Sequence, residues 1–307
     1  MKSVYIALAQ FCERDDAPRK ALLDAGFSVV ENPLGRRLRT DELAAAVGDA
    51  DAIVAGVEPY SAEVLEAFTR VRCISRCGVG VDSIDLDAAK RLGIAVLSTP
   101  DEVAEPVAQL TVGMMLALAR HLHDQRATLR SGSWHRQTGF LLSEWTVGLV
   151  GFGRIGQAVE KCLRPFGAKV AVSDPAVQRQ TLPPGIELLD LNALLARSDL
   201  VSLHVARPAS EGPVISTAQL EKMKPGSRLV NTSRGYLVDE AALFNALQYG
   251  RIAAAALDVY ETEPYSGPLT KLPQVLCTPH IGTLTHASRR AMELKAAANV
   301  VEFLNQK

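Results

Sequence analysis

Short runs of apolar and β-branched residues alternate with amphipathic stretches along the whole chain. In the first third, runs typical of buried strands occur at residues 4–8, 27–30, 52–54, 73–75 and 94–97. A second series follows at residues 147–150, 170–173, 200–204, 228–231, 254–257 and 275–278. Strands that alternate with helices are typical of parallel sheets covered by helices. The pattern therefore predicts the α/β class, with two doubly wound parallel sheets.

A long amphipathic helix separates the two series of strands. Asp101 follows Pro100 and is predicted to cap this helix. Apolar residues then recur at spacings of three and four, at Val103, Val107, Leu110, Met114 and Leu118. A last helix is predicted at residues 286–304. Because 307 residues exceed the size of most single cores, we predict two domains, one at residues 1–100 plus 284–307 and one at residues 101–283.

The composition of the chain limits the kinds of partner that we expect it to bind. Lys and Arg number 33 and Asp and Glu number 34, so the net charge of −1 provides no excess of cations for nucleic acid. The five cysteines are odd in number and contain no Cys-x-x-Cys pair, which argues against a disulfide framework or a metal site. The longest apolar stretch, near residues 107–119, is too short to span a bilayer. We expect a cytoplasmic protein with small-molecule partners.

A glycine motif follows the first strand of the second series. Residues 151–156 read Gly-Phe-Gly-Arg-Ile-Gly between a strand and a predicted helix. Gly151 permits a tight turn, Gly153 lets the backbone approach a pyrophosphate, and Gly156 lets helix and strand pack closely. The amides of Arg154 and Ile155 then open the helix and face the phosphates. This arrangement predicts a dinucleotide-binding Rossmann domain.

Asp174 ends the next predicted strand, about 20 residues beyond the glycines. A carboxylate at this place accepts a hydrogen bond from the adenosine ribose and repels a 2′-phosphate. The sequence therefore predicts NAD, rather than NADP, as the cofactor.

Polar residues follow three later strands. Arg234, Glu263 and His280 lie beyond residues 228–231, 254–257 and 275–278, and Glu261 is a competitor for the place of Glu263. Strand carboxyl ends line the ligand side of an open parallel sheet, so these side chains can converge there. Reduction of a ketone requires a cation for the carboxylate, a proton donor for the alkoxide and a group that tunes the donor. Arg, His and Glu are suited to these roles.

These motifs, together with Gly-Val-Gly-Val-Asp at residues 78–82, resemble the D-isomer-specific 2-hydroxyacid dehydrogenase family over nearly the whole chain. That family includes phosphoglycerate dehydrogenases and glyoxylate/hydroxypyruvate reductases. The resemblance implies an NAD-binding domain inserted into a flavodoxin-like substrate domain, a homodimer, and hydride transfer between NAD and C2 of a small 2-hydroxy or 2-oxo acid. The predicted domain at residues 101–283 is then the NAD-binding one.

The resemblance also implies residue roles. Arg234 would bind the substrate carboxylate and polarise the 2-oxo group, His280 would carry the proton, and Glu263 would orient His280. The amides of Val79 and Gly80 would bind the carboxylate from the other domain. Asp258 would contact the nicotinamide carboxamide. Further cofactor contacts are expected at His204, Ala206, Thr232, Ser233 and Gly282.

Several alternatives remain at this level. A formate dehydrogenase would require Gln in place of Glu263, which argues against formate. An NAD-sensing corepressor-like protein without significant turnover would share the fold and the site residues. Arg36, Arg37 and Arg39 would suit the phosphate of 3-phosphoglycerate, or form a solvated basic turn. Gln109 stands where the family usually has Glu, and it would alter hydrogen bonding near the substrate. The physiological substrate and direction are left open.

Overall fold

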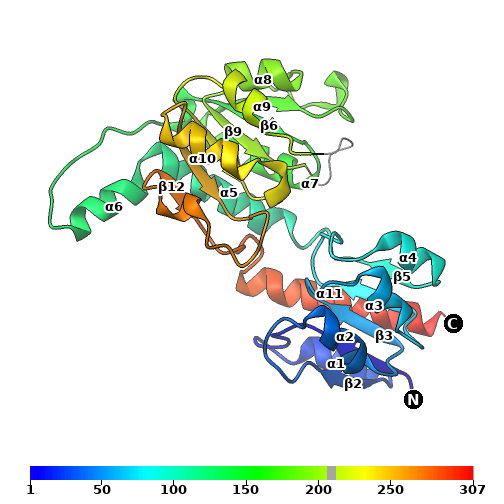
Figure 1. The fold of residues 1–307 in the computed structure, drawn as a ribbon. Helices are drawn as coiled ribbons and strands as arrows, with labels where there is room; N and C mark the ends of the chain where they lie inside the picture. Colours follow the sequence, from blue (N-terminus) through cyan, green and yellow to red (C-terminus); the bar gives the residue numbers. More distant parts are fainter. Residues whose placement is uncertain (206–211, 307) are drawn as a thin grey trace. The chain divides into compact units, whose positions relative to one another are not determined.

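A computed structural model describes residues 1–205 and 212–306 of the chain. These residues form two compact units, residues 1–103 with 283–307 (unit 1) and residues 104–282 (unit 2). Unit 2 is thus inserted into the sequence of unit 1 (Figure 1). Each unit contains one parallel sheet with helices on both faces, which confirms the predicted fold class.

The sheet of unit 1 has the strand order β2-β1-β3-β4-β5. Its strands are β1 (Ser3–Ile6), β2 (Ser28–Glu31), β3 (Ala52–Ala55), β4 (Cys73–Arg76) and β5 (Ala95–Leu97). Its helices are α1 (Ala17–Asp24), α2 (Thr40–Val47), α3 (Ala62–Glu66), α4 (Leu86–Arg91) and α11 (His286–Asn305). Side chains alternate between two cores. Val4 and Ile6 pack with α11 on one face, whereas Tyr5 packs with α2 and α3 on the other.

The sheet of unit 2 has the order β12-β11-β10-β9-β6-β7-β8. Its strands are β6 (Thr146–Val150), β7 (Lys169–Ser173), β8 (Glu187–Leu188), β9 (Leu200–Leu203), β10 (Ser227–Asn231), β11 (Ile252–Leu257) and β12 (Val275–Cys277). Its α-helices are α5 (Ala104–Ala119), α6 (Leu122–Arg130), α7 (Arg154–Leu163), α8 (Leu191–Arg197), α9 (Thr217–Lys222) and α10 (Glu240–Gln248). Helices α5 and α7 cover one face, and α8, α9 and α10 cover the other.

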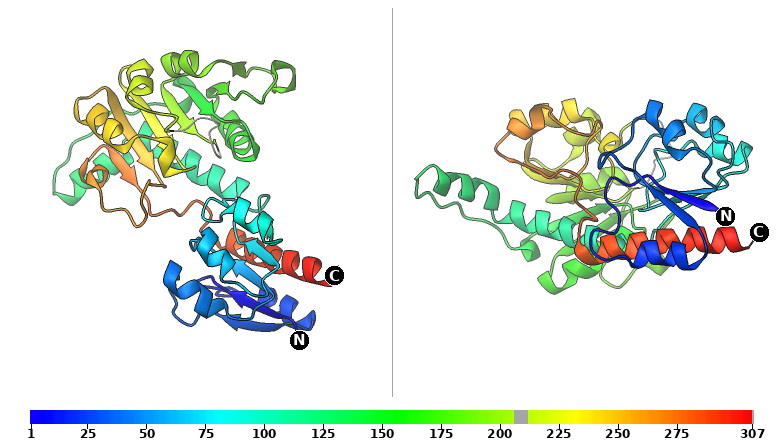
Figure 2. Two further views of the ribbon diagram at one scale, coloured as in Figure 1. Left: turned by 45° about the vertical axis from the view of Figure 1, so that its right-hand side comes forward. Right: turned by 90° about the horizontal axis from the view of Figure 1, so that it is seen from below.

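Three elements differ from the sequence-based expectation. Helix α5 begins at Ala104, so Asp101 precedes the helix and is not its N-cap. Strand β8 is only two residues long and was not predicted. Helix α6 was not predicted, and none of its residues is buried. In Figure 2, α6 projects from the body of unit 2. Local apolar pattern therefore predicts buried elements better than exposed ones.

Among the helices of the described residues, none combines the length and the apolar character needed to cross a membrane.

Candidate active site

The glycine turn joins β6 to α7 in unit 2. Gly151 has φ 92°, and a Cβ on it would lie 2.6 Å from the His204 carbonyl oxygen. A Cβ on Gly156 would overlap the Gly151 carbonyl. Packing within the protein therefore requires both glycines. Gly153 differs, because it is exposed and a Cβ on it would meet no atom within 4 Å.

The open side of Gly153 fits a dinucleotide. Helix α7 begins at Arg154, so the backbone N–H groups of Arg154 and Ile155 lie in its first turn. A helix N-terminus of this kind binds phosphate through its amides and its dipole. No described protein atom accounts for glycine at position 153, whereas close approach of a pyrophosphate would.

Asp174 lies directly after β7 and is hydrogen-bonded to the glycine turn. Its Oδ2 accepts the Phe152 N–H at 2.7 Å, and its Oδ1 accepts the Ala176 N–H at 2.8 Å. The carboxylate is partly exposed. Each oxygen can accept a second hydrogen bond, so the group suits a ribose diol beside the turn.

His204 follows β9 and packs behind the same turn. Its backbone N–H donates to Val150 O at 2.7 Å, and its Nε2 is hydrogen-bonded to the Ser202 hydroxyl at 3.0 Å. Burial lowers the pKa of His204 to about 4, so the ring is neutral near pH 7.

The lowered pKa of His204 predicts a pH dependence of stability. The imidazole has a pKa of about 6.5 in the unfolded chain, which therefore binds more protons than the folded protein below that pH. The free energy of unfolding is expected to fall as the pH drops from about 6.5 to 4, by up to about 3 kcal/mol from this group. Denaturant unfolding at several pH values will measure the fall. His204→Gln should reduce the slope, and an equal slope in both proteins would contradict the assignment.

Arg234 lies in a loop after β10 that Asn231 shapes. The Asn231 side-chain amide donates to the Arg234 carbonyl oxygen at 2.7 Å, and its Oδ1 accepts the Ser233 N–H at 3.1 Å. A Cβ on Gly235 would overlap the Tyr260 backbone. Glycine therefore brings this loop into direct contact with the loop after β11.

His280 and Glu263 form a hydrogen-bonded pair beyond the neighbouring strands β12 and β11. His280 Nδ1 lies 2.8 Å from Glu263 Oε2, and Glu263 Oε1 accepts the Tyr260 N–H at 3.1 Å. The structure therefore places Glu263, rather than Glu261, against the imidazole. Burial acts to raise the pKa of Glu263, but the hydrogen bond from His280 and the charges of His280 and Arg234 lower it overall. The ionised carboxylate holds Nδ1, so Nε2 is the nitrogen that can exchange a proton with a substrate.

Asp258 anchors the loop that carries His280. It is 1% exposed, and its carboxylate accepts the Thr278 hydroxyl at 2.6 Å and the N–H groups of Ile281 and Gly282 at 2.8 and 2.9 Å. Burial raises the pKa of Asp258, although these hydrogen bonds and the His280 charge oppose the shift. The loop holds His280 in the left-handed region, with φ 52°. Contacts of Asp258 and Gly282 with the cofactor stay predictions.

Thr232 and Ser233 form hydrogen bonds within unit 2. The Thr111 hydroxyl on α5 donates to Val107 O at 2.7 Å, so the Thr232 hydroxyl, 2.8 Å from it, is the donor in that pair. The Ser233 hydroxyl donates to Val205 O at 2.5 Å. These bonds fix the loop after β10, and contacts of both residues with NAD stay predictions.

In unit 1, the loop after β4 carries Val79 and Gly80. Thr99 fastens this loop, since its hydroxyl accepts the Gly78 N–H at 2.8 Å and its N–H donates to Gly78 O at 3.0 Å. Val79 is 39% exposed, and within the described residues the N–H groups of Val79 and Gly80 have no hydrogen-bond acceptor. Two such amides in one loop can bind a carboxylate.

Two further positions were predicted from the sequence, Ala206 and Gln109. Ala206 lies outside the described residues. Gln109 is exposed on α5 and hydrogen-bonds within that helix. Sequence reasoning assigned no role to Asn231, Thr111 or Thr278, which position the loops described above. Their signal in the sequence was weak, because single polar residues at the end of a strand or within a helix have many uses.

A glycine turn at a helix N-terminus, an acidic residue after the next strand, and Arg, Glu and His in later loops define the class of NAD-dependent dehydrogenases. The sequence model of the family described as "D-isomer specific 2-hydroxyacid dehydrogenase, NAD binding domain" matches residues 112–282. The chain belongs to this family and is an NAD-dependent oxidoreductase.

Individual relatives agree with this assignment. A hydroxypyruvate reductase from Thermotoga maritima is 38% identical over 274 residues, which cover 87% of this chain and 89% of that protein. A D-3-phosphoglycerate dehydrogenase from Methanocaldococcus jannaschii is 39% identical, and the match covers 87% of this chain but 52% of that protein. The crystal structure of a glyoxylate reductase from Paecilomyes thermophila superposes on this chain with a TM-score of 0.88 and 31% sequence identity. The superposition covers 97% of this chain and 94% of the reductase. The chain thus spans most of two relatives and about half of the third.

Proposed function

We propose that the protein transfers a hydride between NAD and C2 of a small D-2-hydroxy or 2-oxo acid, with 3-phosphoglycerate and glyoxylate or hydroxypyruvate as the leading substrates. The observation that carries the proposal is the pair of His280 and Glu263, with Nδ1 and Oε2 2.8 Å apart, in loops adjoining that of Arg234. The names of the three relatives described above support these substrates.

Residues of unit 2 would hold the cofactor. The amides of Arg154 and Ile155 would bind the pyrophosphate, with Gly151, Gly153 and Gly156 shaping the turn. Asp174 would bind the ribose. When bound, NAD supplies or accepts the hydride at C2. We retain the other predicted contacts as part of this proposal, at His204, Ala206, Thr232, Ser233, Asp258 and Gly282.

His280 is assigned the proton transfer. As a 2-oxo group is reduced, its oxygen develops negative charge and requires a proton. Nε2 of His280 donates that proton in reduction and accepts it in oxidation. The carboxylate of Glu263 keeps a proton on Nδ1 and fixes the orientation of the ring, because its Oε2 lies 2.8 Å from Nδ1. Glu263 is therefore a positioning residue.

Arg234 would bind the substrate carboxylate and polarise the 2-oxo group. A guanidinium offers two parallel N–H donors that match the two oxygens of a carboxylate. The backbone N–H groups of Val79 and Gly80 would bind the same carboxylate. Residues 1–100 plus 284–307 would therefore be the substrate-binding domain. Residues 101–283 would be the NAD-binding domain.

We further propose a homodimer in the cytoplasm. The supporting observation for the dimer is the exposed apolar surface of α6 and the segment after it, where Leu122, Leu129 and Trp134 are 56%, 58% and 82% exposed. A surface of this kind suits a second copy of the chain. Light scattering should give the mass of two chains.

The five cysteines, all free in the structure, suit a reducing compartment such as the cytoplasm. Cell fractionation tests this location.

The decisive experiment is a panel of 2-oxo acids with NADH, followed by the loss of NADH absorbance. Glyoxylate, hydroxypyruvate, phosphohydroxypyruvate and branched 2-oxo acids separate the leading substrates. We expect turnover with at least one of the first three. NADH binding without turnover on any of them would favour a nucleotide-sensing binding protein instead.

Asp174 predicts the choice between NAD and NADP. We expect kcat/KM for NADH to exceed that for NADPH, because the carboxylate repels a 2′-phosphate. Asp174→Asn should raise kcat/KM for NADPH by roughly tenfold, since it removes one charge near the phosphate. Asp190→Asn is a matched control, because Asp190 caps α8 by accepting the Ala193 N–H. An unchanged cofactor ratio in Asp174→Asn would argue against the ribose contact.

A further inference from the structure

The side chain of Tyr260 connects the ends of two neighbouring strands in unit 2. Its hydroxyl lies 3.0 Å from Leu257 O at the end of β11 and 3.1 Å from Thr278 O just after β12. A hydroxyl has one hydrogen, so the two carbonyl oxygens share this donor. Strands β11 and β12 pair with each other and lead to the loops of Glu263 and His280. The mechanism proposed above makes no use of this hydroxyl.

Tyr260 contacts both sides of the pair that His280 and Glu263 form. Its N–H donates to Glu263 Oε1 at 3.1 Å, and Glu263 Oε2 lies 2.8 Å from His280 Nδ1. Thr278 O, which accepts the Tyr260 hydroxyl, also accepts the His280 N–H at 3.1 Å. One residue therefore holds the carboxylate through its backbone and the start of the His280 loop through its side chain.

Tyr260 is itself held in place by its surroundings. It is 8% exposed, and its ring stacks on Tyr265 with the centroids 4.3 Å apart and an angle of 11° between the planes. A Cβ on Gly235 would overlap the Tyr260 backbone, so the loop of Arg234 also packs against this residue. Burial raises the pKa of Tyr260, and the charge of Asp258 acts in the same direction. The hydroxyl therefore keeps its proton and remains a donor near neutral pH.

The backbone of His280 requires support of this kind. Its φ of 52° lies in the left-handed region, which residues other than glycine rarely adopt. Its N–H is shared between Asp258 O at 2.9 Å and Thr278 O at 3.1 Å. The Asp258 carboxylate fixes the residues that follow His280, and the Tyr260 hydroxyl fixes Thr278 before it. Without the hydroxyl, the imidazole would be held less closely against its carboxylate.

We propose that Tyr260 is a positioning residue whose hydroxyl holds the imidazole of His280 against the carboxylate of Glu263 for proton transfer. The inference rests on the proposed function and adds a residue to its proton-transfer step. The ionised carboxylate stabilises the protonated imidazole, which is the form that donates a proton when a 2-oxo group is reduced. The hydroxyl acts through this pair, so its loss should affect turnover more than binding.

Tyr260→Phe removes the hydroxyl but keeps the ring and the N–H that Glu263 accepts. The assay uses NADH and the 2-oxo acid of the panel above that the wild type reduces fastest. We expect kcat to fall by roughly tenfold, the effect of one ordinary hydrogen bond. KM for the 2-oxo acid and the dissociation constant of NADH should stay the same. The limb of the pH profile on which kcat falls with rising pH should move to lower pH, because the carboxylate stabilises the imidazolium less.

Tyr265→Phe is the matched control. Tyr265 belongs to the same aromatic stack, but its hydroxyl accepts the Leu269 N–H at 3.4 Å, away from the His280 loop. The control therefore loses the same chemical group from the neighbouring ring. Its kcat and pH profile should be those of the wild type. An equal effect of the two variants would contradict a specific role of the Tyr260 hydroxyl.

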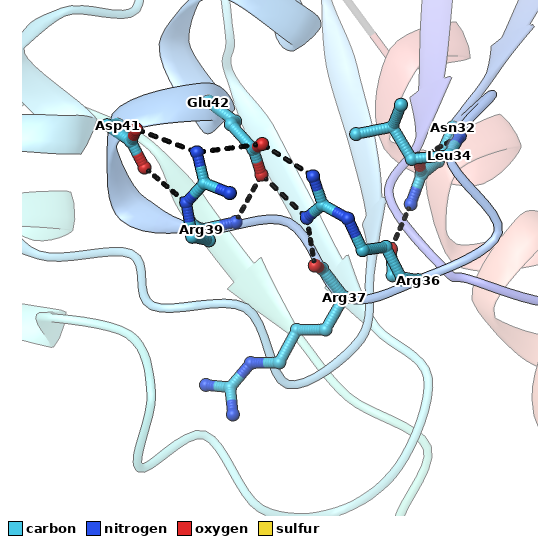
Figure 3. Close-up of polar contacts among 7 residues, drawn as sticks. All are labelled: Asn32, Leu34, Arg36, Arg37, Arg39, Asp41 and Glu42. Atoms are coloured by element: carbon cyan, nitrogen blue, oxygen red, sulfur yellow. Dashed lines mark hydrogen bonds and ion pairs between the residues drawn. The ribbon is translucent and has the colours of Figure 1, made fainter.

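A second control comes from unit 1, where acids and arginines form a cluster at the start of α2 (Figure 3). Arg36 donates to both carboxylate oxygens of Glu42, at 2.9 and 2.6 Å, and Arg39 donates to both oxygens of Asp41, at 3.1 Å each. Figure 3 shows the Arg37 side chain pointing away from this cluster. Glu42→Gln weakens the cluster, so it should lower the free energy of unfolding and leave kcat and the pH profile unchanged. Lost stability is thereby separated from a change in the catalytic pair.

The outcomes distinguish the role of Tyr260 from the proposed function. An unchanged kcat in folded Tyr260→Phe, or a lower kcat with the wild-type pH profile, would overturn the positioning role alone. Combined with His280→Asn, Tyr260→Phe should cause no further loss of kcat, and an additional loss would also overturn that role. Circular dichroism and NADH binding, which need no turnover, will show that the variants are folded. Absence of turnover by the wild type with every 2-oxo acid would overturn the proposed function itself.

Discussion

His280→Asn is expected to lower kcat for 2-oxo acid reduction by about 10² to 10⁴, the range that a positioned general acid contributes. Asparagine lacks a group that can protonate the alkoxide, but it tolerates the left-handed backbone that His280 adopts with φ 52°. KM should change little, because the carboxylate of the substrate is assigned to other groups. Steady-state kinetics over a range of pH measures the loss, and a pH profile identical to that of the wild type would argue against proton transfer by His280.

Glu263 provides the control for this prediction. Glu263→Gln retains the imidazole but removes the anion 2.8 Å from Nδ1, so we expect a smaller loss of kcat than in His280→Asn. Because Glu263 acts through His280, the double variant should be no slower than His280→Asn. Additive losses would show that Glu263 has a separate role.

Arg234→Gln is expected to reduce kcat/KM by about 10² to 10⁴, since two charge-assisted hydrogen bonds to the substrate carboxylate contribute about 1.5 to 3 kcal/mol each. Much of the loss should occur in KM, and the remainder in kcat, because the guanidinium also polarises the 2-oxo group. Dissociation constants for NADH should stay unchanged. A normal KM of Arg234→Gln for the 2-oxo acid would contradict the proposed role of Arg234.

Arg234→Lys separates substrate binding from a structural ion pair. Lysine keeps the positive charge but lacks the planar pair of donors. If Arg234 served only to balance Glu263 electrostatically, lysine would restore most of the activity. We expect instead that it restores only a small part, because a single ammonium cannot bind both carboxylate oxygens in one plane. Circular dichroism and unfolding curves will show that both variants are folded.

Much of the fold could be predicted from the sequence, for a physical reason that particular strands illustrate. Strands β3 and β9 are buried on both faces, and their mainly apolar sequences predict this burial without knowledge of the rest of the fold. The start of α5 was misplaced because an aspartate after a proline resembles an N-cap, whereas the helix begins at Ala104. Helix α6 escaped prediction because none of its residues is buried and most of them are polar.

The sequence by itself determined the α/β class, the glycine turn before α7 and the kinds of side chain available for catalysis, because these depend on local pattern and residue chemistry. Only the tertiary structure decided that Glu263 rather than Glu261 contacts His280, and that Arg36 and Arg39 are engaged by acids. It also placed the Tyr260 hydroxyl between the ends of β11 and β12. Such contacts depend on side-chain orientation and on how distant loops pack, and spacing along the chain encodes neither.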